Sequence, residues 1–130
     1  MRLFLRALAA LLFLASYACR GPLGAPLEAF HDGRLPAAAA GFRHLEPELS
    51  ELSDVERARY ALYRGLAHLG LGDARNADRW LSLAKRLDAE DLRRFDASER
   101  GELDAAWRSL GRAAGDVSLA RGEPAPRALP

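Results

Sequence analysis

The chain has 130 residues, among them 24 Leu and 26 Ala, whereas Val occurs twice and Ile and Thr are absent. Leu and Ala favour helices, while strands draw on β-branched and aromatic residues, so this composition excludes a sheet-built domain and predicts an all-α fold. The formal net charge is +1, but residues 19–130 alone carry 17 basic and 18 acidic side chains, so no uniform basic surface and no nucleic-acid partner is expected.

The first eighteen residues have the three parts of a secretory signal peptide. Two arginines give a positive start, residues 7–15 (ALAALLFLA) are apolar, and small residues precede a cleavage site after Ala18. The apolar stretch 7–18 has 12 residues, and a membrane-spanning helix needs ~20. We therefore expect export and removal of residues 1–18 rather than a permanent membrane helix.

Cys19 is the only cysteine, so it cannot form a disulfide within the chain. Its place directly after the apolar run resembles that of the lipid-bearing cysteine of bacterial lipoproteins. The resemblance implies cleavage before Cys19, a diacylglyceryl thioether on its sulfur and membrane anchoring through the lipid chains. The next residue is Arg20 and not the Asp that favours retention in the inner membrane. By the same resemblance the protein is expected at the outer membrane. The alternative is ordinary cleavage after Ala18, leaving a soluble periplasmic protein with a free thiol.

The remaining chain divides into three parts by composition. Residues 19–26 contain the cysteine and a Gly- and Pro-rich tether, and residues 120–130 form a Pro-rich tail that we expect to be disordered. The segment 27–119 between them is the expected helical domain. Its first elements are a short helix over 27–31 and a helix over 35–45, which a loop over 46–52 follows.

The next helix has the clearest start in the chain. Ser53 and Glu56 match a capping box, and Gly70 and Gly72 are good stop residues. Asp73 is then the expected cap of the following helix.

The spacing of apolar residues predicts that this following helix covers 74–87. The link before it has only two or three residues, so the two helices must be antiparallel neighbours. A further helix is expected over 97–110, with an additional short one over 112–120.

A degenerate repeat joins these segments. Gly33, Gly72 and Gly111 are spaced by 39 residues and then 39 again. After the first two glycines the residues agree in register: Ala38 with Ala77, Phe42 with Leu81, and Leu45 with Ala84. Each of these two copies is therefore expected to be a helix, a glycine turn and a second helix.

The best copy, residues 58–91, resembles the tetratricopeptide family of helix–turn–helix repeats. Gly65 matches the family's close-contact glycine and Gly72 its turn, while the small positions and the end of the second helix match at Ala77, Ala84, Leu87 and Asp88. The chain departs from the family pattern at Ala61, Arg64, His68, Leu81 and Ala89. The resemblance implies a short array of antiparallel helix hairpins, and the alternative is an unrelated bundle of four or five helices.

In tetratricopeptide proteins the first helix of each unit lines a concave groove that receives a peptide or a partner helix. By that resemblance five residues would face the groove and bind a partner: Arg59, Leu62, Tyr63, Leu66 and Leu69. The competing interpretation is that the leucines pack inside the bundle while Arg59 and Tyr63 cover its surface.

The sequence contains no pattern typical of catalysis or metal binding. His31, His44 and His68 do not pair at a spacing of four residues, and no glycine-rich phosphate loop or nucleophile elbow is present. We expect no enzymatic activity, no cofactor and no metal. The carboxylates crowded over 46–56 are interpreted as helix caps and solvated side chains.

These observations predict a membrane-tethered, non-catalytic adaptor that binds another cell-envelope protein through its helical surface. Because the array is short, a partner or a second copy of the chain is expected to complete its core. The alternatives are a purely structural envelope lipoprotein and a small periplasmic enzyme or metal-binding protein that uses His44 and His68.

Overall fold

The computed structural model describes residues 21–120, and this part of the chain is built from helices without strands. The elements are α2 (Gly24–His31), α3 (Leu35–His44), the 3-10 helix η1 (Glu46–Glu51), α4 (Asp54–Gly70), α5 (Ala74–Glu90) and α6 (Ala97–Ala120). The prediction of an all-α helical array is thereby confirmed. The signal segment 1–18, Cys19 and the tail after Ala120 lie outside the described residues.

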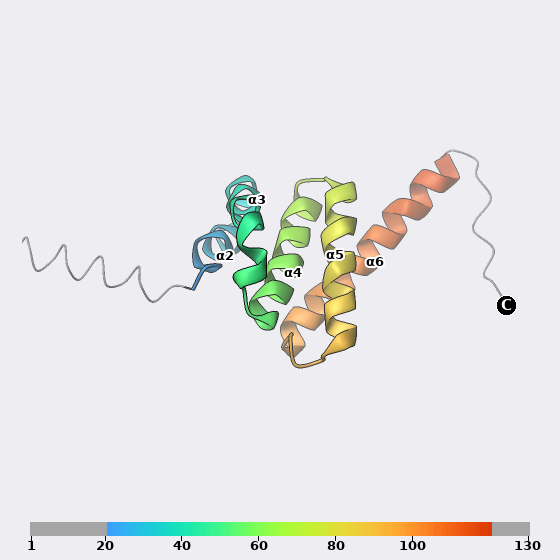
Figure 1. Ribbon diagram of the computed structural model, residues 1–130. Helices are drawn as coiled ribbons and strands as arrows, with labels where there is room; N and C mark the ends of the chain where they lie inside the picture. Colours follow the sequence, from blue (N-terminus) through green and yellow to red (C-terminus); the bar gives the residue numbers. More distant parts are fainter. Residues whose placement is uncertain (1–20, 121–130) are drawn as a thin grey trace, which may run out of the picture.

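The array begins with two helix hairpins that share one turn geometry (Figure 1). Gly33 joins α2 to α3 with φ of 74°, and Gly72 joins α4 to α5 with φ of 75°. The backbone N–H of Arg34 donates to Ala29 O at 2.8 Å, and that of Asp73 donates to His68 O at 2.9 Å, 39 residues later. Left-handed backbone of this kind favours glycine, so the two repeat glycines end their helices for the same steric reason.

The repeat also holds in the core. Ala38 and Ala77 are both fully buried, and so are Phe42 and Leu81 one turn further along α3 and α5. Small residues followed by bulky ones therefore occupy equivalent inner positions of the two hairpins. Val55 is the exception among the apolar residues of α4, because it lies exposed in the first turn of that helix.

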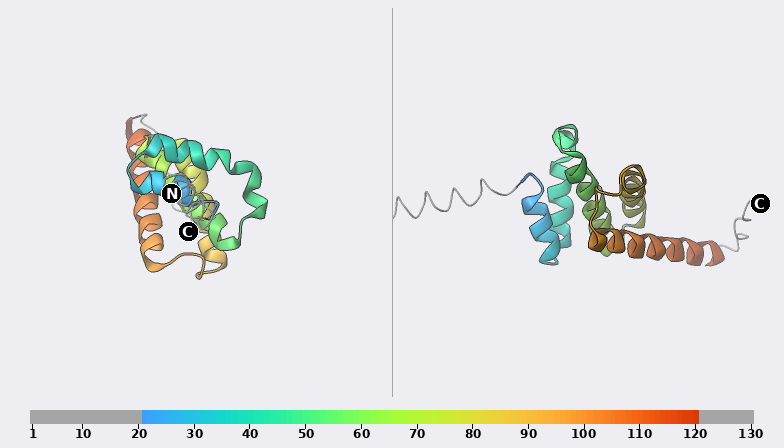
Figure 2. Two further views of the ribbon diagram at one scale, coloured as in Figure 1. Left: turned by 90° about the vertical axis from the view of Figure 1, so that its left-hand side faces the viewer. Right: turned by 90° about the horizontal axis from the view of Figure 1, so that it is seen from below.

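The third copy departs from the first two. Gly111 was expected to end a helix, but it lies inside α6, which continues unbroken from Ala97 to Ala120. The residues that follow it are Arg and two Ala, which favour helix, whereas Asp73 after Gly72 caps the next one. The helices expected over 97–110 and 112–120 are thus a single helix, whose C-terminal part extends past the other helices (Figures 1 and 2).

The structure differs from the sequence-based expectation in three places, the first being the end of α5, which continues to Glu90 instead of residue 87. Helix α2 begins at Gly24, and Leu23 and Pro26 are buried, so the folded part reaches into the segment assigned to the tether. The segment 46–52, expected to be a loop, is largely the 3-10 helix η1.

No helix of the described part is long and apolar enough to cross a membrane.

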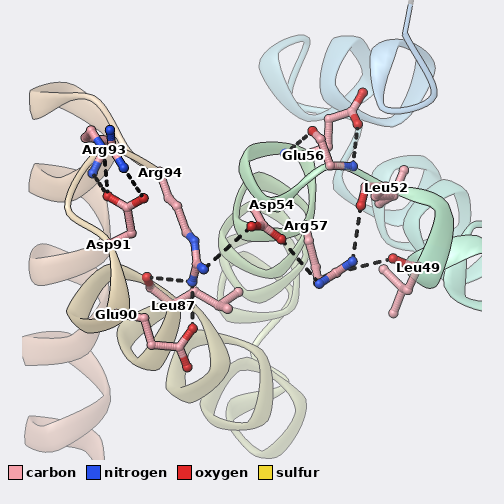
Figure 3. A network of polar contacts seen from close by, with 11 residues as sticks. Leu49, Leu52, Asp54, Glu56, Arg57, Leu87, Glu90, Asp91, Arg93 and Arg94 are labelled. Atoms are coloured by element: carbon pink, nitrogen blue, oxygen red, sulfur yellow. Dashed lines mark hydrogen bonds and ion pairs between the residues drawn. The ribbon is translucent and has the colours of Figure 1, made fainter.

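Polar contacts hold together the end of the array at which α4 begins and α5 ends (Figure 3). The Arg57 side chain donates to Leu49 O at 3.3 Å and to Leu52 O at 3.1 Å, and it lies 3.5 Å from Asp54. Asp54 also lies 3.8 Å from the guanidinium of Arg94, a residue of the loop before α6. The start of α4 is therefore tied both to the connection before it and to the loop that leads into α6.

A buried arginine fills the space between α4 and α5. The Arg64 guanidinium stacks over the Trp80 ring at 4.2 Å, and its Nη1 donates to Glu46 Oε2 at 2.8 Å and to the Tyr60 hydroxyl. The Tyr60 hydroxyl in turn donates to Phe42 O at 2.8 Å. This cluster joins both hairpins and η1 through one cation held by an aromatic face and a carboxylate.

Candidate protein-binding groove

One face of the array is formed by α2, α4 and α6 and contains two adjacent hollows. The apolar hollow has a volume of about 420 Å³. Its walls come from all three helices: Phe30, Leu66, Leu69, Glu102, Ala105, Ala106 and Ser109. The polar hollow has a volume of about 280 Å³ and a lining drawn from the same helices and the start of α6: Leu27, His31, Arg59, Tyr63, Asp96, Ser98 and Glu99. We call the two hollows together the groove face.

An aromatic pair separates the hollows. The rings of Phe30 and Tyr63 meet edge to face with centroids 5.2 Å apart, and the His31 ring lies 5.5 Å from Tyr63. Phe30 faces the apolar hollow and Tyr63 the polar one. The two hollows therefore adjoin each other across this pair of contacting rings.

The start of α6 is fixed against α4 by a second capping box. Asp96 Oδ1 accepts the N–H of Glu99 at 2.8 Å, and Glu99 Oε2 accepts the N–H of Asp96 at 3.0 Å. The other oxygen of the buried Glu99 lies 2.7 Å from Arg59 Nε on α4. One carboxylate thus caps α6 and sets its position across the groove face.

The polar half of the groove face is rich in negative charge. Burial raises the pKa of Tyr63 to about 12, with further contributions from Glu102, Glu99 and Asp96, while Arg59 acts in the opposite direction. The neutral phenol is therefore the form that this environment favours. Its hydroxyl is accompanied by one cation and three carboxylates within electrostatic reach.

Four of the five residues proposed for partner binding line this face. Arg59 and Tyr63 border the polar hollow, and Leu66 and Leu69 border the apolar one, so one stripe of α4 serves both. Leu62 is fully buried and lines neither hollow. Leu62 therefore packs inside the bundle, as the competing interpretation of the leucines expected. Leu66 and Leu69, in contrast, are half-buried and border the open apolar hollow.

The residues of α2 and α6 on this face were not among those proposed, although the repeat could have located them. A shift of 39 residues carries Leu66 back to Leu27 and forward to Ala105, and all three line the groove face. The same shift carries Leu69 back to Phe30 and Tyr63 forward to Glu102. The period therefore locates part of each flanking wall, although it carries Leu69 forward to Arg108, which lines neither hollow.

The tryptophans differ in exposure. Trp80 is buried against Arg64, whereas Trp107 on α6 is 39% exposed. Trp107 borders a third hollow of about 180 Å³ with Asp78, Leu110 and Gly111, on the α5 side of α6. This hollow is not part of the groove face, because its lining comes from α5 and α6 and contains no residue of α2 or α4.

The histidines do not converge. His68 is buried with Nδ1 3.2 Å from Asp73 Oδ2, His31 stands against Tyr63, and His44 is exposed at the end of α3. Among the described residues, no three His, Cys, Asp or Glu side chains form a group that could hold a metal ion. Asp73 caps α5 by accepting from the Asn76 side chain and backbone, and these hydrogen bonds, with a smaller contribution from His68, lower its pKa.

No family model matches the chain, and comparisons with curated proteins and with solved structures gave no significant match. The tetratricopeptide resemblance therefore stays a prediction from the sequence.

Proposed function

We propose that this chain is a non-catalytic adaptor whose groove face binds a segment of another cell-envelope protein, with tetratricopeptide-like hairpins as the scaffold. In this proposal the segment 1–18 directs export. A lipid on Cys19 then holds the protein at the membrane, facing the periplasm, with the outer membrane as its location. The adaptor has no cofactor and carries out no reaction.

The observation that carries the proposal is the apolar hollow between α2, α4 and α6. Its lining has five apolar side chains and only two polar ones, and Phe30, Leu66 and Leu69 are half-buried rather than packed away. Concave apolar surface with a few polar groups at its edge is typical of a binding site. Rigid helices supply all of its walls, so a partner segment would meet a preformed surface.

Site-specific photo-crosslinking in intact cells tests the proposal. A photoreactive amino acid at Ser109, which lines the apolar hollow, should give one discrete crosslinked partner, and the same group at exposed Ala40 on α3 should not. Ala105→Trp fills the hollow without changing charge and should abolish the Ser109 product. Equal crosslinking from both positions, or a product that persists in Ala105→Trp, would contradict binding in the groove face.

The anchoring part of the proposal has a separate test. The intact mass of the protein purified from cells should equal that of residues 19–130 plus a diacylglyceryl group and an N-terminal acyl chain. The unmodified mass of residues 19–130 would instead indicate a soluble periplasmic protein. A mass that retains residues 1–18 would contradict export by cleavage of a signal peptide.

A further inference from the structure

The carboxylate of Glu102 holds a particular position on the groove face. Glu102 lines the apolar hollow together with Leu66 and Ala105, and its charge also acts on Tyr63 in the polar hollow. It is exposed, and no hydrogen bond or ion pair to it is present within the described part of the chain. A free carboxylate therefore stands where the apolar and polar halves of the groove meet.

The other charged groups on this face are already engaged. Glu99 forms the capping box and the ion pair with Arg59, and Asp96 accepts the N–H of Glu99. Among the described residues, Arg59 is the only Lys or Arg that lines either hollow. After the Arg59–Glu99 pair is set aside, Asp96 and Glu102 leave the groove face with an excess of negative charge.

We propose that the partner segment bound in the groove face is apolar with an adjoining Arg or Lys, and that Glu102 receives this cation while the apolar side chains occupy the hollow. The inference deepens the adaptor function proposed above and depends on it. Its basis is charge complementarity: an unpaired carboxylate beside an apolar surface favours a cation and repels an acidic segment. Arg is the better fit of the two, since its guanidinium binds a carboxylate through two parallel hydrogen bonds and stacks on aromatic rings such as that of Tyr63.

The contribution of Glu102 should be one of selectivity more than of overall affinity. An ion pair at the exposed edge of an interface changes binding about two- to fivefold, and reversal of one charge adds repulsion of similar size. The apolar hollow supplies the remaining affinity through burial of the partner's side chains. Loss of the charge should thus change which segments bind while binding itself persists.

A library of random 12-residue peptides displayed on phage provides the probe. The protein purified from cells in its processed form is immobilised, and peptides are counter-selected on the support alone. We expect the selected peptides to combine apolar residues with Arg or Lys and to lose binding to Ala105→Trp. Peptides that bind Ala105→Trp as well as the parent would lie outside the groove face and would contradict the adaptor proposal itself.

Charge reversal separates the inference from the adaptor proposal. Glu102→Arg should weaken the selected basic peptides about four- to twenty-fivefold, and selection on this variant should favour acidic residues in their place. Glu48→Arg is the matched control, because Glu48 is an exposed glutamate of η1, on the opposite side of the molecule from α6 (Figure 2, left). If peptides need an open hollow but show no basic preference, or bind Glu102→Arg unchanged, the charge inference is wrong and the adaptor proposal stands.

Discussion

Gly65 on α4 and Leu81 on α5 are in such close contact that there is no space for a side chain at position 65. A Cβ placed there would lie 2.7 Å from Leu81 Cγ and 3.1 Å from the Leu81 backbone nitrogen. Rotation of the leucine relieves the first contact but leaves the second. The spacing of these two helices, which also sets the position of the groove residues on α4, therefore depends on this glycine.

Gly65→Ala should lower the free energy of unfolding by about 1–3 kcal/mol, the usual effect of overpacking a tight core. Gly101→Ala on α6 is the matched control, because nothing lies within 4 Å of a Cβ at that position. This control should raise stability by about 0.5–1 kcal/mol, since alanine favours the helix interior. Urea denaturation followed by circular dichroism measures both. A neutral Gly65→Ala would mean that α4 and α5 can separate without loss.

The three repeat glycines give a second prediction. Gly33→Ala and Gly72→Ala should each destabilise the fold by about 1–2 kcal/mol, because both positions have left-handed backbone that alanine adopts at a cost. Gly111→Ala should instead stabilise by about 1 kcal/mol, since Gly111 lies inside a continuous helix with open space around it. Thermal unfolding of the three variants distinguishes the cases. A destabilised Gly111→Ala would indicate a turn at that position.

Local signals in the sequence predicted most of the fold. The Ser53 capping box forms as expected, with Glu56 N donating to Ser53 Oγ at 3.2 Å and Ser53 N donating to Glu56 Oε2 at 2.9 Å. Asp73 and the turn glycines were equally predictable, because the backbone groups that they help to hydrogen-bond lie within a few residues of them in the sequence. Gly111 is the exception, because the helix-forming Arg and Ala residues that follow it continue α6 despite the regular spacing of the glycines.

Long-range features were harder to predict. The sequence offered no sign that Arg64 would be buried over Trp80, because that contact depends on how α5 packs against α4. Likewise the electrostatic effect of Glu102 on Tyr63 depends on the position of α6, to which the Arg59–Glu99 pair contributes. Helical periodicity identifies the inner stripe of each helix, but it does not tell which neighbouring helix will cover that stripe.

The Arg59–Glu99 pair should contribute to both stability and the shape of the groove. Glu99→Gln keeps an oxygen for the capping box but removes the charge that pairs with Arg59, so we expect a loss of about 1–2 kcal/mol. Combining it with Arg59→Gln should give a coupling energy of about 1 kcal/mol in a double-mutant cycle, because Arg59 is only partly buried. Urea unfolding of the four proteins supplies the values. Additive losses would show that the two side chains act independently.

The ionisation of Tyr63 reports directly on the charge of the groove face. Its pKa of about 12 lies above the usual 10.0, so the folded state favours the neutral phenol. The associated stabilisation is fully present below pH 10 and is lost as the pH rises from 10 towards 12. Glu102→Gln removes the largest electrostatic contribution to this shift and should lower the pKa of Tyr63, while burial keeps it above 10.

NMR titration of tyrosine labelled with carbon-13 at Cζ resolves Tyr63 from Tyr60, whose pKa burial also raises. Glu48→Gln serves as the control and should leave the Tyr63 midpoint in place, since Glu48 is not among the groups that act on it. A cationic peptide from the library selection should lower the same midpoint by placing positive charge beside Glu102. If neither Glu102→Gln nor the peptide shifts the midpoint, the Glu102 carboxylate does not reach the polar hollow, and the charge selectivity assigned to it loses its structural basis.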